Sequence, residues 1–131
     1  MTSNEVLIAD NSTIDAAYMK VMLERNGWKT DVVTDGIEVL QRLKEKHYPL
    51  VILNGRLRRL SGEDTIKRVR ELQKNASQQS VIIGTVGSTL MTERNKLINA
   101  GANDCVSKPV YQDSLLETIQ VNMVGQARAT A

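Results

Sequence analysis

An amide side chain occupies the position in this sequence that is best placed for chemistry. Asn54 ends an uninterrupted apolar run at 50–53, and Gly55 follows it. A strand that is apolar at every position is covered on both faces, as in parallel sheets flanked by helices. The last residue of such a strand lies at the carboxyl edge of the sheet, where open α/β sheets hold their ligands. We therefore expect Asn54 to lie in a functional site.

Side chains from three other strands are expected at the same edge. Asp10 and Asn11 follow the first apolar run, Val86 follows the fourth, and Lys108 follows the fifth. The first and third strands of a doubly wound sheet meet at its switch point, which brings Asp10 and Asn11 beside Asn54. Among these side chains Asp10 carries the one carboxylate, so we expect it to pair with the Lys108 ammonium. Removing either partner would strand the other charge at a partly buried site, at a cost of about 3 to 5 kcal/mol.

The elements that carry these residues are predicted from the hydrophobic pattern. Apolar runs too short for helices indicate strands at 6–9, 30–33, 50–53, 81–85 and 105–107. A segment of helical period follows each of them. Alternation this regular, with crossovers this short, predicts an α/β fold: a doubly wound, five-stranded parallel sheet with helices on both faces.

Capping and turn residues mark the helices. The first helix is predicted to begin at 12 or 13, where Ser12 and Asp15 form a capping pattern, and to end at Asn26–Gly27. Apolar residues at helical spacing are expected to face the core: Ile14, Tyr18, Val21 and Met22 in the first helix, Ile37, Leu40 and Leu43 in the second, Ile66, Val69 and Leu72 in the third (about 62–75), and Leu115, Leu116 and Ile119 in the fifth.

Length and composition indicate one globular domain. Of the 131 residues, 17 are basic and 15 acidic, and the net charge of +2 does not indicate nucleic-acid binding. The chain has one cysteine, no apolar stretch of membrane-spanning length and no signal segment at its start, so we expect a soluble, cytoplasmic protein. We expect the domain to comprise 1–123, with 124–131 as a flexible tail or the start of a linker.

Three motifs carry a resemblance to a known family. They are VLIADNS at 6–12, the strand ending at Asn54 with Gly62 eight residues later, and GANDCVSKPV at 101–110. Together they resemble the receiver domain of two-component response regulators over essentially the whole chain, and the segment at 89–110 is similar to receivers of hybrid histidine kinases. The resemblance implies a flavodoxin-like (βα)5 fold with strand order 2-1-3-4-5. It also implies a protein partner, which would be a histidine kinase, a phosphotransfer domain or an output domain, with homodimerisation as a further option and no direct contact with nucleic acid or membrane.

Receiver chemistry, as the resemblance implies it, depends on carboxylates that this sequence lacks. In receivers an aspartate at the position of Asn54 takes a phosphoryl group from phosphohistidine, and an acidic pair at the positions of Asp10 and Asn11 helps to hold Mg²⁺. An amide nitrogen cannot act as the carboxylate nucleophile that forms an acyl phosphate. Asn54 is therefore a degenerate phosphoacceptor position. Asp10 and Asn11 are a remnant acidic pocket with too little negative charge for a dedicated Mg²⁺ site.

Further positions of the sequence differ from the pattern that the resemblance implies. Val86 stands where receivers have a Thr or Ser that contacts the phosphoryl group, and Cys105 stands at the position of the switch aromatic. Arg56 adds a cation beside the acceptor position. Lys108 and Pro109 conform to the family, and a cis peptide bond is expected between them. By analogy with the family, a partner surface is expected at Glu93, Arg94, Leu97, Val110 and Tyr111.

These departures predict a pseudo-receiver, which is a protein-interaction and regulatory module without enzymatic activity, phosphorylation or a cofactor. The alternative is a Mg²⁺-dependent phosphoacceptor receiver of a phosphorelay, in a hybrid kinase or a response regulator, whose acceptor aspartate has been replaced by Asn54. The sequence leaves open whether that replacement is natural or engineered. A flavodoxin-like electron carrier is excluded, because the loop after the first strand lacks the glycine and the dense hydroxyls of a phosphate cradle.

Other conspicuous residues are expected to have ordinary structural roles. Cys105 reads as a small buried hydrophobe rather than a reactive thiol. His47 has no Cys or His companion at ligand spacing, so no metal site is expected. The basic residues at 56–59 and 67–70 could hold an acidic partner, but such a run is more often a solvated face.

Overall fold

The computed structural model describes residues 4–87 and 91–130, in which five strands alternate with five helices. Their bounds are β1 Glu5–Ala9, α1 Thr13–Arg25, β2 Lys29–Val33, α2 Gly36–Glu45, β3 Leu50–Asn54, α3 Gly62–Leu72, β4 Val81–Val86, α4 Met91–Ala100, β5 Asp104–Ser107 and α5 Gln112–Thr130. Every predicted strand is present, and each is one residue longer than predicted. The alternation that the hydrophobic pattern indicates is confirmed.

The five strands form one parallel sheet in the order β2-β1-β3-β4-β5, which confirms the predicted fold. β1 lies between β2 and β3, and its Ile8 is aligned with Val32 on one side and Ile52 on the other. The chain therefore winds outward in both directions from the β1–β3 pair. The carboxyl ends of these two strands lie side by side, at the place where such sheets bind ligands.

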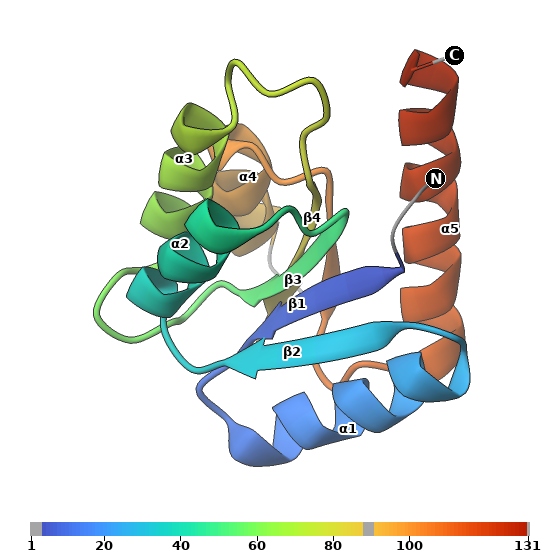
Figure 1. Cartoon of the computed structure of the whole chain (residues 1–131). Coiled ribbons are helices and arrows are strands. Elements are labelled where there is room, and N and C mark those ends of the chain that lie inside the picture. The colour runs from blue at the N-terminus through green and yellow to red at the C-terminus, as the bar shows by residue number, and fades with distance from the viewer. Residues whose placement is uncertain (1–3, 88–90, 131) are drawn as a thin grey trace.

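Helices cover both faces of the sheet, with α1 and α5 on one side and α2, α3 and α4 on the other (Figure 1). Alternate residues of β3 enter the two cores. Leu50 and Ile52 pack toward α1 and α5, and Val51 and Leu53 pack toward α2, α3 and α4. Because both faces are buried, the strand needs an apolar residue at every position, which is the pattern seen in the sequence.

The helix α1 buries a different face from the one predicted. Its buried residues are Ala16, Met19, Met22 and Leu23. Of the predicted stripe only Met22 is buried, whereas Ile14, Tyr18 and Val21 are 80%, 50% and 51% exposed. Apolar residues occupy most of the circumference of α1, so its periodicity allows two different stripes. Packing against the sheet selects the stripe with the small Ala16, and the apolar α1 stripe of Ile14, Tyr18 and Val21 faces outward.

The ends of α1 are as predicted. The Ser12 side chain caps the helix by accepting a hydrogen bond from the Asp15 backbone N–H at 3.3 Å. Asn26 is the C-cap, and Gly27 follows with φ at +91°, a left-handed conformation that glycine adopts without a steric penalty.

The other helices follow the prediction in part. Leu43, Ile66, Val69, Leu115 and Ile119 are buried as expected. Ile37, Leu40 and Leu116 are half-buried, and Leu72 is exposed at the end of α3, which stops there rather than near 75.

The last helix continues past the predicted end of the domain. α5 extends to Thr130 and therefore runs through the segment that the sequence analysis assigns to a flexible tail. The division of the chain at 123 stays a prediction. Within 4–87 and 91–130, no helix combines the length and the apolar character needed to cross a bilayer.

Candidate functional site

The carboxyl ends of β1, β3 and β5 bring the predicted polar side chains together. Lys108 Nζ lies 2.9 Å from Asp10 Oδ2. Asn54 Nδ2 donates to Asp10 Oδ1 at 3.2 Å and to Asn11 Oδ1 at 3.3 Å. The Asp10 side chain is fully buried and that of Lys108 is 20% exposed. The predicted pairing of Lys108 with Asp10 is confirmed, and Asn54 lies beside it as the switch-point argument requires.

A second carboxylate, which the sequence analysis missed, also binds Lys108. Asp15 Oδ2, from the first turn of α1, lies 2.8 Å from Lys108 Nζ. Burial by itself would lower the pKa of Lys108, but the hydrogen bonds and charges of Asp15 and Asp10 outweigh burial and raise it. The hydrogen bond from Lys108 lowers the pKa of Asp15. Lys108 is therefore held as a cation between two carboxylates.

The amide of Asn54 is fixed at both of its polar atoms. Its Nδ2 binds the first-strand residues, and its Oδ1 accepts a hydrogen bond from the backbone N–H of Arg56 at 3.2 Å. Asp10 Oδ1 is also shared, because it accepts from the backbone N–H of Ser12 at 2.9 Å. Both polar atoms of the Asn54 amide and both carboxylate oxygens of Asp10 therefore already have partners within the chain.

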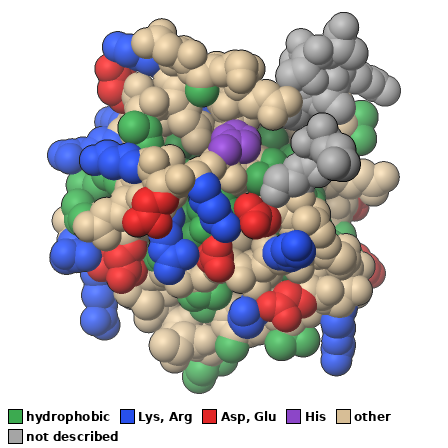
Figure 2. Space-filling view, viewed as in Figure 1, with side chains coloured by type: hydrophobic (Ala, Val, Ile, Leu, Met, Phe, Trp, Pro, Cys, Tyr) green, Lys and Arg blue, Asp and Glu red, His purple; other side chains and the backbone are tan. Residues whose placement is uncertain are grey.

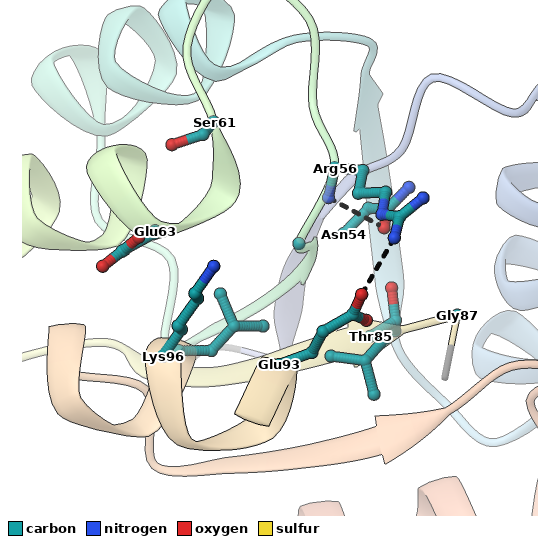
Figure 3. Close-up of a pocket in the computed structure, with 11 residues that line it drawn as sticks. Asn54, Arg56, Ser61, Glu63, Thr85, Gly87, Glu93 and Lys96 are labelled. Atoms are coloured by element: carbon teal, nitrogen blue, oxygen red, sulfur yellow. Dashed lines mark hydrogen bonds and ion pairs between the residues drawn. The ribbon is translucent and has the colours of Figure 1, made fainter. Parts of the chain in front are cut away.

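A hollow of about 250 Å³ opens beside Asn54, between α3 and α4 (Figure 3). Val86 and Leu97 are buried side chains that line it. The Arg56 guanidinium crosses its mouth and binds Glu93 from α4 at 2.9 Å. Figure 3 also shows Lys96 of α4 on the side of the hollow toward α3. The Val86 side chain is aliphatic and offers no hydroxyl to a ligand, whereas Ser61 and Thr85 also line the hollow.

Thr85 is a polar residue that the sequence analysis did not single out. It is fully buried next to Asn54 in the sheet register, and its hydroxyl is a buried side-chain group without a hydrogen-bond partner in the described part of the chain. Along β4, Ile83 packs toward α1 and α5, and Val86 packs toward α3 and α4. Strand alternation therefore turns Thr85 toward α1 and α5, which is the side of Asn54 and Lys108.

Comparison with known protein families identifies the family to which this chain belongs. The sequence matches the Response regulator receiver domain over residues 6–120. The chain belongs to this family. The match covers most of the chain, and it confirms the resemblance carried by the three sequence motifs.

Curated relatives place this receiver among signalling proteins. The chain is 29% identical over 122 residues to Hybrid signal transduction histidine kinase K of Dictyostelium discoideum, with 89% of the chain and 10% of that protein covered. It is 31% identical over 110 residues to Sensor protein EvgS of Escherichia coli O157:H7, with 84% of the chain and 9% of that protein covered. The chain thus spans about a tenth of the length of these relatives, and the match to receivers of hybrid histidine kinases is confirmed.

Solved structures share the fold of this receiver. A CheY-like receiver domain protein of Methanospirillum hungatei has a TM-score of 0.87 at 22% identity, with 98% of this chain and 99% of that chain covered. The receiver domain of a sensor histidine kinase from Pseudomonas aeruginosa, described with magnesium in its active site cleft, has a TM-score of 0.82 at 24% identity, with coverage of 92% and 98%. The co-crystal structure of the Saccharomyces cerevisiae phosphotransfer protein Ypd1 with the receiver domain of Ssk1 gives a TM-score of 0.82 at 25% identity, with coverage of 89% and 86%.

The magnesium ion that the receiver family implies does not fit the donors at this site. Mg²⁺ requires oxygen ligands in near-ideal octahedral geometry. Among the strand-end side chains Asp10 supplies the one carboxylate, and its Oδ2 is bound to the Lys108 ammonium. The side-chain oxygen of Asn54, Oδ1, accepts a hydrogen bond from the Arg56 backbone N–H. Within the described residues there is no cluster of three His, Cys, Asp or Glu side chains able to hold a metal ion.

The predicted partner surface on α4 and α5 is only partly at the surface. Leu97 and Val110 are 3% and 7% exposed and belong to the two cores, which corrects their expected place on a contact face. Arg94 binds Asp104 at 2.7 Å and the Cys105 carbonyl at 2.8 Å. Glu93 is paired with Arg56. Tyr111, which is 66% exposed, is the apolar residue of this set that remains available.

The remaining family positions are as expected from the sequence. The Lys108–Pro109 peptide bond is cis. Cys105 is 5% exposed, and burial raises the pKa of its thiol. A buried thiol with a raised pKa is a poor nucleophile, so Cys105 fits the role of a small core residue.

Proposed function

We propose that this receiver domain acts as a protein-interaction and regulatory module that works without phosphorylation, without a bound Mg²⁺ and without enzymatic activity. The observation that carries the proposal is the amide of Asn54, hydrogen-bonded to Asp10, Asn11 and Arg56 at the acceptor position. An amide there supplies no carboxylate to form an acyl phosphate.

The charge balance of the site supports the same proposal. A phosphoryl group with its metal ion would need a free ammonium, a hydroxyl and several carboxylates. Here Lys108 is shared between Asp10 and Asp15, and Asp10 is the one carboxylate among the strand-end side chains. Ligand entry would first require these ion pairs to break, at a cost that bound phosphate would have to offset.

A protein partner is proposed because the proteins similar to this chain are signalling proteins. The Ssk1 receiver was crystallised with the phosphotransfer protein Ypd1, and other relatives are hybrid or sensor histidine kinases. We therefore propose that the partner is a histidine kinase, a phosphotransfer domain or an output domain, in the same chain or a separate one.

The apolar α1 stripe is the surface best suited to that partner. Ile14, Tyr18 and Val21 lie one to two turns apart and are exposed by half or more. Figure 2 shows hydrophobic side chains at the surface along its lower edge, where α1 lies in the same view of Figure 1. Exposed apolar clusters rimmed by polar residues mark interaction sites. The α1 stripe also adjoins the functional site, because Asp15 of the same helix binds Lys108.

Phosphorylation is tested with acetyl phosphate and Mg²⁺, with intact mass as the readout. We expect no phosphorylated species from the unchanged chain or from Asn54→Asp. The triple variant Asn54→Asp, Asn11→Asp, Val86→Thr serves as the positive control, because it restores the nucleophile, the second acid and the hydroxyl. Phosphorylation of the unchanged chain would overturn the proposal.

The alternative function, a Mg²⁺-dependent phosphoacceptor whose aspartate was replaced, is favoured by the survival of Asp10 and Lys108 at their family positions. It predicts that the single change Asn54→Asp is enough to form a stable acyl phosphate. The same experiment therefore separates the two functions.

The proposed contact surface is tested with purified kinase and phosphotransfer domains from the host organism. We expect Tyr18→Ala to weaken binding at least about tenfold, as expected for a central aromatic contact worth over 1 kcal/mol. Val121→Ala is the matched control, because Val121 is a 63% exposed apolar residue on α5. Equal effects of the two variants would argue against the α1 stripe.

A further inference from the structure

The chain contains two Asn–Gly pairs, Asn26–Gly27 and Asn54–Gly55. Such pairs can lose the asparagine amide spontaneously, because glycine has no Cβ to hinder attack by its backbone nitrogen. In this reaction the glycine nitrogen gives up its proton and bonds to asparagine Cγ, the bond from Cγ to the amide nitrogen breaks, and ammonia leaves with a proton from solvent. Water then opens the cyclic imide to aspartate or isoaspartate.

At Asn54 the attacking nitrogen is held in the sheet. The Gly55 N–H donates to the Thr85 carbonyl at 2.9 Å, and the Gly55 carbonyl accepts from the Gly62 N–H at 3.1 Å. The side-chain amide is bound at both ends by Asp10, Asn11 and the Arg56 N–H. Attack would require these hydrogen bonds to break together.

Packing prevents the 54–55 peptide from rotating. A Cβ atom built on Gly62, the first residue of α3, would lie 2.6 Å from both the Asn54 carbonyl oxygen and Gly55 Cα. Real Cβ atoms do not approach other atoms so closely, so α3 packs directly on this peptide through a glycine. There is therefore no free space at this position for the backbone rotation that would bring the Gly55 nitrogen to Asn54 Cγ.

At Asn26 the same dipeptide is exposed at the end of a helix. Asn26 Nδ2 donates to the Met22 carbonyl at 2.8 Å, and the Gly27 N–H donates to the Glu24 carbonyl at 3.2 Å. The Gly27 carbonyl accepts from the Asn4 side chain at 2.6 Å in a hydrogen bond that is exposed to solvent. A Cβ atom on Gly27 would have nothing within 4 Å. Helix ends fray, so these bonds open without disturbing the core.

We propose that the folded protein undergoes deamidation at Asn26 and protects Asn54 from it. Both sites share the sequence Asn–Gly, so the difference in reactivity comes from the fold. The inference goes beyond the proposed function and does not depend on it. Its consequence for the site is that an aspartate is not generated at position 54 while the domain stays folded.

The test follows deamidation of the intact chain during incubation at mildly alkaline pH, by peptide mapping and mass spectrometry. Trypsin releases the two sites in separate peptides, 26–29 and 47–56. In the folded protein we expect Asn54 to react at least about tenfold more slowly than Asn26, equivalent to about 1.4 kcal/mol. In a denaturing concentration of urea, the two rates should converge.

Two variants and one independent measurement make the inference falsifiable. Asn26→Gln should remove most of the mass gain of the folded protein, and Asn54→Gln should leave it unchanged. Amide hydrogen exchange should be much slower at Gly55 than at Gly27. Equal deamidation rates in the folded chain, or a Gly55 amide that exchanges as fast as that of Gly27, would overturn the proposal.

Discussion

Two clusters in this receiver pair basic side chains with carboxylates and differ in burial. The Lys108 cluster, formed by Lys108, Asp10 and Asp15, lies at the carboxyl edge of the sheet. The second is named the edge cluster because it lies at β2, the edge strand of the sheet. It links Glu5 of β1 and Asp31 of β2 to Arg42 and Lys46 at the end of α2. Figure 2 shows acidic and basic side chains interspersed on the face that includes β2.

Burial decides how strongly each cluster acts on stability. In the Lys108 cluster the Asp10 side chain is fully buried and Lys108 is 20% exposed, with Asp15 at 47%, whereas every charged side chain of the edge cluster is 31% to 45% exposed. Charges near water interact weakly and are screened by salt, whereas a buried charge that loses its partner has no solvent to replace it. The difference indicates that the buried Asp10–Lys108 pair contributes more to stability than the ion pairs of the edge cluster.

The largest effect is expected from Asp10→Ala. It leaves Lys108 with the exposed Asp15 as its carboxylate partner, and it removes the acceptor for the Asn54 side-chain amide and the Ser12 N–H. We predict a loss of about 3 to 5 kcal/mol in the free energy of unfolding, measured by urea denaturation. The double variant Asp10→Ala, Lys108→Met should recover part of the loss, because it removes the Lys108 ammonium that has lost its buried partner. An unchanged melting temperature for Asp10→Ala would show that the pairing does not stabilise the fold.

A smaller effect of opposite sign is expected from Thr85→Val. The Thr85 hydroxyl is buried and has no hydrogen-bond partner among residues 4–87 and 91–130, and valine has nearly the same shape as threonine. Removing an unsatisfied polar group of this kind should stabilise the protein by about 1 kcal/mol. Thr65→Val is the matched control, because the Thr65 hydroxyl donates to the Ser61 carbonyl at 2.7 Å. If Thr85→Val destabilises as much as Thr65→Val, the Thr85 hydroxyl has a partner in solution.

Asp15→Asn should change the acid dependence of stability. The pKa of Asp15 is lowered by Lys108, so this pairing stabilises the fold above the unfolded pKa of about 3.9 and is lost as the pH falls through the folded pKa. The pKa of Lys108 is raised, so its contribution is present below about pH 10.4 and is lost as the pH rises through its folded pKa. Unfolding followed from pH 7 to pH 2 should therefore show a shallower loss of stability in Asp15→Asn than in the unchanged chain. Identical pH profiles would contradict the role given to Asp15.

The smallest effect is expected from Asp31→Asn in the edge cluster. Asparagine keeps an acceptor for the buried Tyr48 hydroxyl, which donates to Asp31, and removes only the charge that faces Lys46 and Arg42. We predict a loss of about 0.2 to 1 kcal/mol that shrinks further at high salt. A loss as large as that of Asp10→Ala would remove the distinction between the two clusters.

Local chemistry in the sequence predicted most of the fold. Each apolar run at strand length became a strand, and Ser12, Asn26 and Gly27 ended α1 where their backbone preferences require. These features depend on residues close together in the chain. The meeting of Asp10, Asn54 and Lys108 followed from the place where the strands of a doubly wound sheet end, and the strand order followed from the resemblance to receivers.

The errors lie where several faces of an element were equally suitable. α1 has apolar residues on most of its surface, and only contact with the sheet decides that Ala16 and Leu23 are inside while Ile14 is outside. Leu97 and Val110 read as contact residues by analogy but fill the cores. The helix-capping pattern accounts for Asp15 from residues nearby in the chain, and no local signal indicates its distant partner Lys108.

The sequence alone determined that this receiver has an amide at the acceptor position, one remaining acid before it and a lysine to pair with that acid, because these are matters of residue identity. Only the tertiary structure decided that Asp15 also binds Lys108, that the Thr85 hydroxyl is buried with no partner among the described residues, and that the Asn54–Gly55 peptide is held beneath α3. Each of these depends on distances between elements, which arise from how the helices pack on the sheet rather than from any motif in the chain.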